Sequence, residues 1–264
     1  MMINIFRATI YKIQHSVLPC FFLIFSVLCL FFSLFFNAGR IVDVVTPAGI
    51  RIGFFPAGSM EGVNTDAVAL ATAQSFNLFA WIAVTVQLAV TYRRDANGGA
   101  WRMAISHGKS RIHYELADYF GQTVWVQVWY FLLSAVTFCM AGNMFSCLTV
   151  EFVSISTLCW IQNALMIQCF LSVGRVVCAF TSSEIAFVTF GFLETAISLI
   201  VAASNTTQNP SVFTSIILNW TPMPYWLKLG ACHMDLAKIL LVSIITILLS
   251  EGVLFLFEAK RDIK

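Results

Sequence analysis

Charged residues are scarce in this chain of 264 residues, because Asp, Glu, Lys and Arg together make up only 11% of it. Soluble domains typically carry about 25%, so the low charge argues against a water-soluble protein. Hydrophobic residues reach 59% and the mean hydropathy is +0.84. The composition predicts an all-α integral membrane protein with no separate soluble catalytic domain.

Motifs of catalysis and of metal binding are missing as well. There is no C-x-x-C pair or Cys/His cluster, and neither H-E-x-x-H nor G-x-S-x-G, which a membrane-embedded hydrolase would need, is present. Ser110 and the three residues before it resemble the end of a phosphate-binding loop, but Met103 stands where its first glycine is required. We expect a non-catalytic chain without a metal site, a bound nucleotide or another cofactor. Cys147 and Cys232 lie in or near outer loops and could pair.

Six apolar segments are long enough to cross a membrane as helices. The fourth and fifth form one hydrophobic run, which Thr181 and Glu184 split with the spacing of a capping box. The sequence therefore predicts a single transmembrane domain over residues 1–264. Its six spans are expected at about residues 17–36, 67–91, 120–144, 152–180, 182–203 and 236–257.

The distribution of Lys and Arg predicts the orientation. With six spans both termini share one side, and that side collects most of the 15 basic residues: Arg7, Lys12, Arg93, Arg94, Arg102, Lys109, Arg111, Arg175, Lys260, Arg261 and Lys264. The other side keeps Arg40, Arg51, Lys228 and Lys238. Basic loops favour the cytoplasm, so the termini and the turn after the fourth span are predicted to be cytoplasmic.

The N-terminal segment has a helical pattern of its own. Ile3, Phe6, Ile10 and Ile13 recur at intervals of three and four residues, away from Arg7. This pattern suits a short helix that lies in the membrane interface. The alternative is a basic N-terminus that only fixes the topology. A cleaved signal peptide is disfavoured, because its apolar core would usually be about 7–15 residues long.

A polar island of about thirty residues, 91–119, lies between the second and third spans. Trp101, Ala104, Ile105 and Gly108 form a mildly apolar helical face within it, which could insert into a groove on a partner protein. The alternative is a solvated basic loop that only reports topology. The island is large for a simple turn, which favours a docking role.

The island and the order of the spans resemble the six-span permeases of type-two ABC exporters. The local pattern is apolar-x-x-Gly-x-x-Arg-x-x-aromatic, and the resemblance covers nearly the whole chain in span number and order. The basic residue that many relatives carry shortly after the aromatic is replaced by Ala117 and Asp118. The resemblance implies a coupling helix seated on a separate cytoplasmic ATPase, with contacts from Ile105, Ser106, His107, Gly108, Lys109, Arg111 and Tyr114.

The same resemblance implies the partners and the location. Two permease chains, identical or homologous, would form the translocation path, and the ATPase subunits would bind ATP and Mg²⁺. The expected place is a bacterial plasma membrane, and the expected substrate is a hydrophobic or amphipathic peptide or antibiotic. Nucleic acid is not expected as a partner.

Polar residues inside the spans are candidates for the translocation path. Gln74, Asn77, Trp81 and Thr85 share one face of the second span, where they would line a route or bond to other helices. Glu194 lies near the middle of the fifth span, as a functional group or an interhelical partner. Glu251 is expected to snorkel toward the cytoplasmic end of the sixth span. A proton-coupled secondary transporter using Glu194 or Glu251 is the alternative to the ABC permease, and a membrane scaffold without transport also stays open.

Overall fold

The computed structural model describes residues 2–31, 33, 40–42, 54–56, 69–70, 72–73, 76–98, 111–181, 185 and 236–260. Within these residues the elements are α1 (Met2–Gln14), α2 (Leu18–Phe31), β1 (Arg40–Val42), β2 (Phe54–Pro56), α4 (Asn77–Gly98), α6 (Arg111–Met144), α7 (Val150–Thr181) and α11 (Leu236–Lys260). The described chain is predominantly helical, as the composition predicts. The one sheet found in it pairs β1 with β2 antiparallel, with Ile41 opposite Phe55.

Three helices of the described chain are long and apolar enough to cross a membrane: Ile112–Met144, Val150–Phe180 and Ala237–Phe257. They correspond to the third, fourth and sixth predicted spans. The pair α1 and α2, bent by 61°, passes the same test together and gives a fourth candidate. In α4 the apolar stretch is shorter, Ile82–Thr91. Most of the fifth predicted span, 182–203, lies outside the described residues, as do Glu184 of the predicted capping box and Cys232.

The polar island is shorter than predicted, because helices enter it from both ends. α4 continues past Thr91 to Gly98, and α6 begins at Arg111 rather than near Phe120. Helical backbone satisfies its own hydrogen bonds, so these polar turns can extend the spans beyond the apolar region. Residues 99–110, which hold most of the predicted coupling helix, lie outside the described residues.

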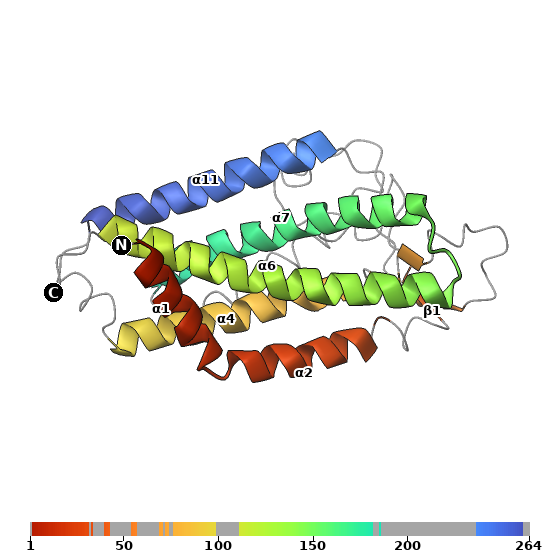
Figure 1. The fold of residues 1–264 in the computed structure, drawn as a ribbon. Coiled ribbons are helices and arrows are strands. Elements are labelled where there is room, and N and C mark those ends of the chain that lie inside the picture. Colours follow the sequence, from red (N-terminus) through yellow and green to blue (C-terminus); the bar gives the residue numbers. More distant parts are fainter. Residues whose placement is uncertain are drawn as a thin grey trace.

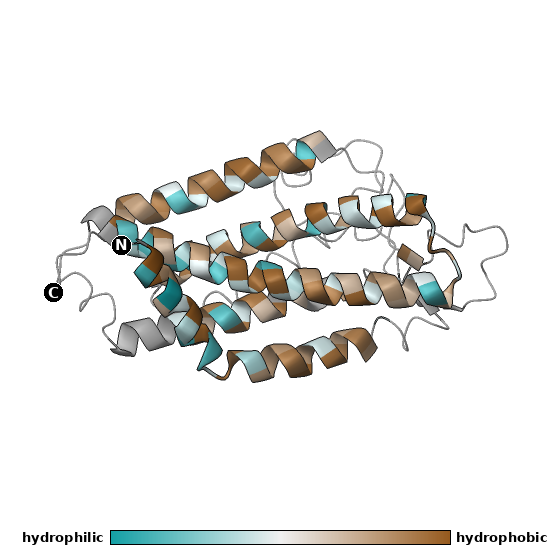
Figure 2. Ribbon diagram, in the orientation of Figure 1, coloured by the Kyte–Doolittle hydropathy of each residue, from teal (hydrophilic) through white to brown (hydrophobic). Residues whose placement is uncertain are grey.

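α4, α6, α7 and α11 run lengthwise through the molecule (Figure 1). The last turns of α4, α7 and α11 and the first turn of α6 gather at one end, where the N-terminus also lies. Here we call it the α6-start end. The turn between α6 and α7 lies at the opposite end. Figure 2 shows mostly apolar residues along α2 and α11, whereas α1 alternates hydrophilic and apolar residues.

The main core forms where α4, α6, α7 and α11 meet. Its largest fully buried side chains include Phe76, Tyr130 and Ile167, which are at most 1% exposed. Lipid tails are as apolar as these side chains, so close packing and hydrogen bonds, rather than the hydrophobic effect, hold such helices together. Directional polar contacts between the helices therefore carry unusual weight in fixing their positions.

Local signals explain the two tight turns. Between α1 and α2 the Ser16 hydroxyl donates to the Ile13 carbonyl at 2.6 Å and accepts from the Leu18 amide at 3.1 Å. Pro19 then occupies the first turn of α2, where its missing N–H costs nothing. Before α7 the Thr149 hydroxyl accepts from the Phe152 amide at 3.1 Å. These hydroxyls satisfy amides that have no partner within the helix.

Candidate functional site: a buried arginine between three helices

Arg175 of α7 is the centre of a buried ionic cluster. Its Nη1 donates to Glu251 Oε2 of α11 at 2.7 Å, and its Nη2 donates to Glu115 Oε2 of α6 at 2.8 Å. The Arg175 side chain is 6% exposed, that of Glu251 8% and that of Glu115 23%. One guanidinium thus ties three helices together near the α6-start end. We call Glu115, Arg175 and Glu251 the arginine cluster.

The geometry suits a guanidinium rather than an ammonium. Arginine presents its donors in a rigid planar fork, so each terminal nitrogen can serve a different carboxylate. Arg175 Nη2 also lies 3.4 Å from the Glu115 carbonyl oxygen, and the Cζ atom stands 5.0 Å from the centre of the Tyr119 ring. An aromatic face attracts such a cation further. Removing one member of a buried ion pair typically costs about 3–5 kcal/mol, because the remaining charge loses its partner.

The polar residues of α6 recur on one helical face. Glu115, Asp118, Tyr119 and Gln122 follow one another at intervals of three, one and three residues, which places them on adjoining turns. Asp118 accepts from the Thr9 hydroxyl of α1 at 3.1 Å and from Gln122 Nε2 at 2.6 Å. This face therefore extends the cluster's connections from α7 and α11 to the N-terminal helix.

Close approach of α1 to α6 depends on Gly121. A Cβ atom at this position would lie 2.7 Å from Thr9 Cγ2, so a larger residue would push the two helices apart. Small residues allow membrane helices to approach in this way. Thr9 and Ile13 are the buried residues of α1, at 4% and 1% exposure, whereas Ile3 is 63% exposed. Thus only one end of the predicted apolar face is buried, and interfacial placement of α1 stays a prediction.

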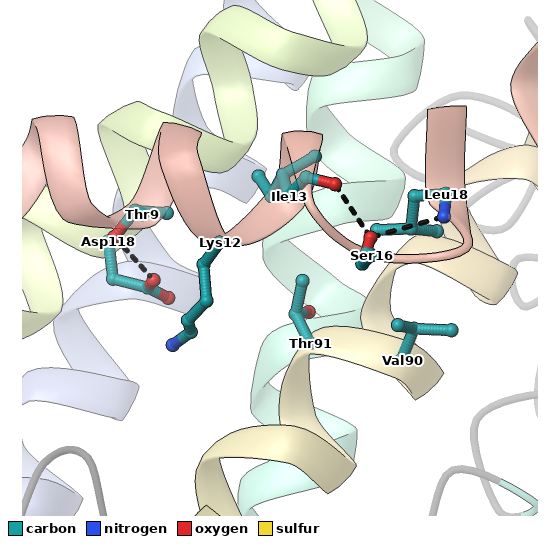
Figure 3. A pocket seen from close by; sticks show the side chains of 8 residues that line it. All are labelled: Thr9, Lys12, Ile13, Ser16, Leu18, Val90, Thr91 and Asp118. Carbon is teal, nitrogen blue, oxygen red and sulfur yellow. Dashed lines mark hydrogen bonds between the residues drawn. The ribbon is translucent and has the colours of Figure 1, made fainter. Parts of the chain in front are cut away.

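A small recess separates α1 from α4 and α6. Figure 3 shows its lining, to which Lys12 and Ser16 contribute from the N-terminal region, Thr91 from α4 and Asp118 from α6. Its space is about that of a single water molecule. The recess is too small for an organic substrate, and it marks a polar contact between helices rather than a binding site.

A second polar network continues from the arginine cluster along α6 and α7. Gln168 Nε2 donates to the Tyr119 hydroxyl at 2.6 Å and to Thr123 Oγ1 at 2.9 Å. Gln127 Nε2 donates to the Ala164 carbonyl at 2.9 Å. Because these amides and hydroxyls bond across the two helices, the network fixes α6 against α7 over several turns.

The predicted translocation residues are described only in part. Thr85 lies in α4 and is 6% exposed, inside the helix bundle. Asn77 and Trp81 belong to the same helix, at its beginning and one turn later. Gln74 and Glu194 lie outside the described residues. Lining of a substrate route by this set therefore stays a prediction.

The predicted coupling residues divide at the start of α6. Arg111 and Tyr114 form the first turn of this helix, and Tyr114 is buried at 9% exposure. Ile105, Ser106, His107, Gly108 and Lys109 lie outside the described residues. The next residue of α6, Glu115, belongs to the arginine cluster, so the end of the predicted coupling motif adjoins the cluster directly.

Sequence reasoning missed this cluster and misplaced two of its members. Arg175 was expected in a cytoplasmic turn, but it lies inside α7 at 7% exposure. Glu251 was expected to snorkel, but it is 6% exposed and bound to Arg175. A usable signal existed, because an arginine within an apolar segment requires a carboxylate partner. Glu115 and Glu251 are the carboxylates near the same predicted end of the membrane.

Among the described residues, no group of three His, Cys, Asp or Glu side chains could hold a metal ion. A scan against protein-family models, a search of curated proteins and a search of solved structures return no significant match for this chain.

Proposed function

We propose that this chain is the transmembrane permease subunit of an ATP-driven ABC exporter, with ATP hydrolysis confined to separate cytoplasmic ATPase subunits. The chain and a second permease chain would form the translocation path together. A hydrophobic or amphipathic peptide or antibiotic is the substrate class we expect, and the α6-start end would face the cytoplasm of a bacterium.

The observation that carries this proposal is the continuity from the end of the coupling motif to the arginine cluster. Arg111, Tyr114 and Glu115 lie on one unbroken helix, and Glu115 is bound to Arg175 at 2.8 Å. A partner that displaces residues 105–111 would act directly on the first turns of α6. Through Arg175 the same displacement would reach α7 and α11.

The division of roles follows from chemistry. Ile105 to Lys109 would contact the ATPase, and α6 would transmit the displacement. ATP and Mg²⁺ would supply the driving force when bound to the ATPase partner. The buried pairs of Arg175 would keep α7 and α11 in step with α6, because separating them leaves a charge without its partner in a medium of low polarity.

A pull-down of the tagged chain from its native host in mild detergent, followed by mass spectrometry, tests the proposal. We expect a stoichiometric ATPase with a complete phosphate-binding loop, which is lost when residues 106–111 are scrambled. A matched control is Glu151→Gln, an exposed change at the opposite end of the bundle, which should retain the ATPase. Recovery of the intact chain without any ATPase would refute the proposal.

Arg175→Met separates docking from coupling in the same preparation. We expect this variant to retain the ATPase, because the docking residues are unchanged, but to lose ATP-driven transport in vesicles. Transport at the wild-type rate by a folded Arg175→Met protein would show that the arginine cluster does not transmit the motion.

The second candidate, a proton-coupled transporter, is favoured by one specific observation. Glu251 Oε1 is buried and has no hydrogen-bond partner among the described residues, although Oε2 is bound to Arg175. A carboxyl group with a spare oxygen could accept a proton. This candidate predicts that Glu194→Gln or Glu251→Gln abolishes transport driven by a proton gradient without ATP. Absence of any such transport in the wild type would eliminate it.

A further inference from the structure

A groove between α6 and α7 lies on the outside of the bundle, toward the turn that joins the two helices. Its volume is about 260 Å³, near the lower end for ligand pockets (roughly 300 Å³). Phe131, Leu148 and Val153 form part of its lining and are each at least 50% exposed. The lining contains no charged side chain. The groove therefore opens toward lipid and suits an uncharged, largely apolar occupant.

Two hydrogen-bond donors in this groove have no acceptor. Ser134 is 1% exposed, and neither its Oγ nor Trp160 Nε1 has a hydrogen-bond partner among the described residues. Other hydroxyls nearby are satisfied, since Ser156 donates to the Phe152 carbonyl at 2.7 Å and Thr157 to the Val153 carbonyl at 2.8 Å. A buried donor without an acceptor is costly, so an occupant that supplies an acceptor would be favoured.

Helix length places these donors near a membrane boundary. α6 has 34 residues, which is about 51 Å and exceeds a hydrocarbon core of about 30 Å. If the excess is shared between the two ends, about 10 Å of α6 stands outside the core at each end. Ser134 lies ten residues before the end of α6 and Trp160 ten residues after the start of α7, about 15 Å from each helix end. Both thus lie about one turn inside the boundary.

We propose that this groove binds a diacyl lipid of the leaflet at the α6–α7 turn, with an ester carbonyl accepting from Ser134 and Trp160. Ester carbonyls lie beside the hydrocarbon boundary, where the donors lie, and the attached acyl chain matches the apolar, uncharged lining. Rotation of the Ser134 hydroxyl about its side-chain bond brings the donor toward the bound carbonyl. The proposal depends on membrane insertion alone and holds for either transport mechanism.

Comparison of two lipids with identical tails tests the role of the carbonyl. The delipidated full chain is titrated with a diester phosphatidylcholine and with its diether analogue, and bound lipid is counted by native mass spectrometry. We expect the diester to bind about three- to tenfold more tightly, the range for one hydrogen bond. Ser134→Ala and Trp160→Phe should each reduce this preference, and Ser154→Ala should leave it unchanged. Ser154 is the matched control, because it is exposed and its hydroxyl bonds to the Glu151 carbonyl.

A variant that fills the groove tests the site itself. Ala135 lines the groove, and Ala135→Leu should weaken binding of both lipids, whereas Ser154→Leu should not. Equal affinity for diester and diether in the wild type would overturn the proposal. So would a preference that survives in both Ser134→Ala and Trp160→Phe. Conversion of a dimer into monomers by Ala135→Leu, with lipid binding unchanged, would overturn it as well and assign the groove to a second copy of the chain.

Discussion

Replacing Arg175 with methionine tests how much the arginine cluster contributes to the fold. Methionine has a similar length and no charge, so Glu115 and Glu251 would stay buried without their cation. Breaking a buried pair costs about 3–5 kcal/mol, and we expect the free energy of unfolding to fall by about this amount. Glu251 is 8% exposed in its side chain and Glu115 23%, so most of the loss should come from Glu251.

The neutral variants of the two carboxylates should differ in the same order. Glu251→Gln keeps the shape and leaves Arg175 bound to Glu115, so we expect a loss of about 1–3 kcal/mol. Glu115→Gln should cost about 1 kcal/mol, because water reaches this side chain more easily and screens its charge. Arg175→Met combined with Glu251→Leu should recover part of the stability, since apolar replacements of both partners remove the unpaired charge.

Unfolding in mixed micelles, followed by tryptophan fluorescence, measures these differences. Arg7→Met is the matched control, because Arg7 is exposed on α1, and its effect should stay within about 0.5 kcal/mol. The reasoning fails if Arg175→Met unfolds within about 1 kcal/mol of this control. It also fails if Glu115→Gln proves more damaging than Glu251→Gln, because burial would then not decide the cost.

Two further changes probe how α1 and α2 are attached to α6. Gly121→Leu should separate α1 from α6 around Thr9 and cost about 1–3 kcal/mol, measured by the same unfolding assay. Gly252→Leu is its control, because nothing lies within 4 Å of the added Cβ, and wild-type-like unfolding of Gly121→Leu would contradict the close contact. Trp129→Phe removes the bond from Nε1 to Ser26 Oγ, 2.8 Å long, and should cost about 1 kcal/mol. Adding Ser26→Ala should cost little more, whereas additive losses would mean that the two residues act separately.

The spans that the sequence predicted well are those whose apolar run is also their helix. α11 begins at Leu236, as predicted, and α7 begins at Val150, close to the predicted start. The helices that enter the polar island were cut short, because hydropathy reports where lipid is favoured and not where helical hydrogen bonds end. Polar turns such as those from Arg111 to Asp118 satisfy their own backbone groups and can extend a span without any apolar signal.

The arginine cluster was beyond periodicity and hydropathy for a different reason. Its members are separated by 60 and 76 positions along the chain, so no local pattern joins them. A count of basic residues by side treats every arginine as exposed, which put Arg175 outside the membrane. The error is physical, because charge is tolerated inside a bundle when a carboxylate from another helix meets it, and only packing brings the two together.

The place of this cluster matters for any partner that acts on α6. A slide of α6 by one turn, about 5.4 Å, would separate Glu115 from Arg175. The separated charges would stay in a region that water barely reaches, at a cost of several kcal/mol. A smaller displacement that keeps the 2.8 Å contact must carry Arg175 along, and the 2.7 Å contact then carries Glu251. Force applied just before Arg111 is therefore expected to move α6, α7 and α11 together, which is the response that a coupling segment requires.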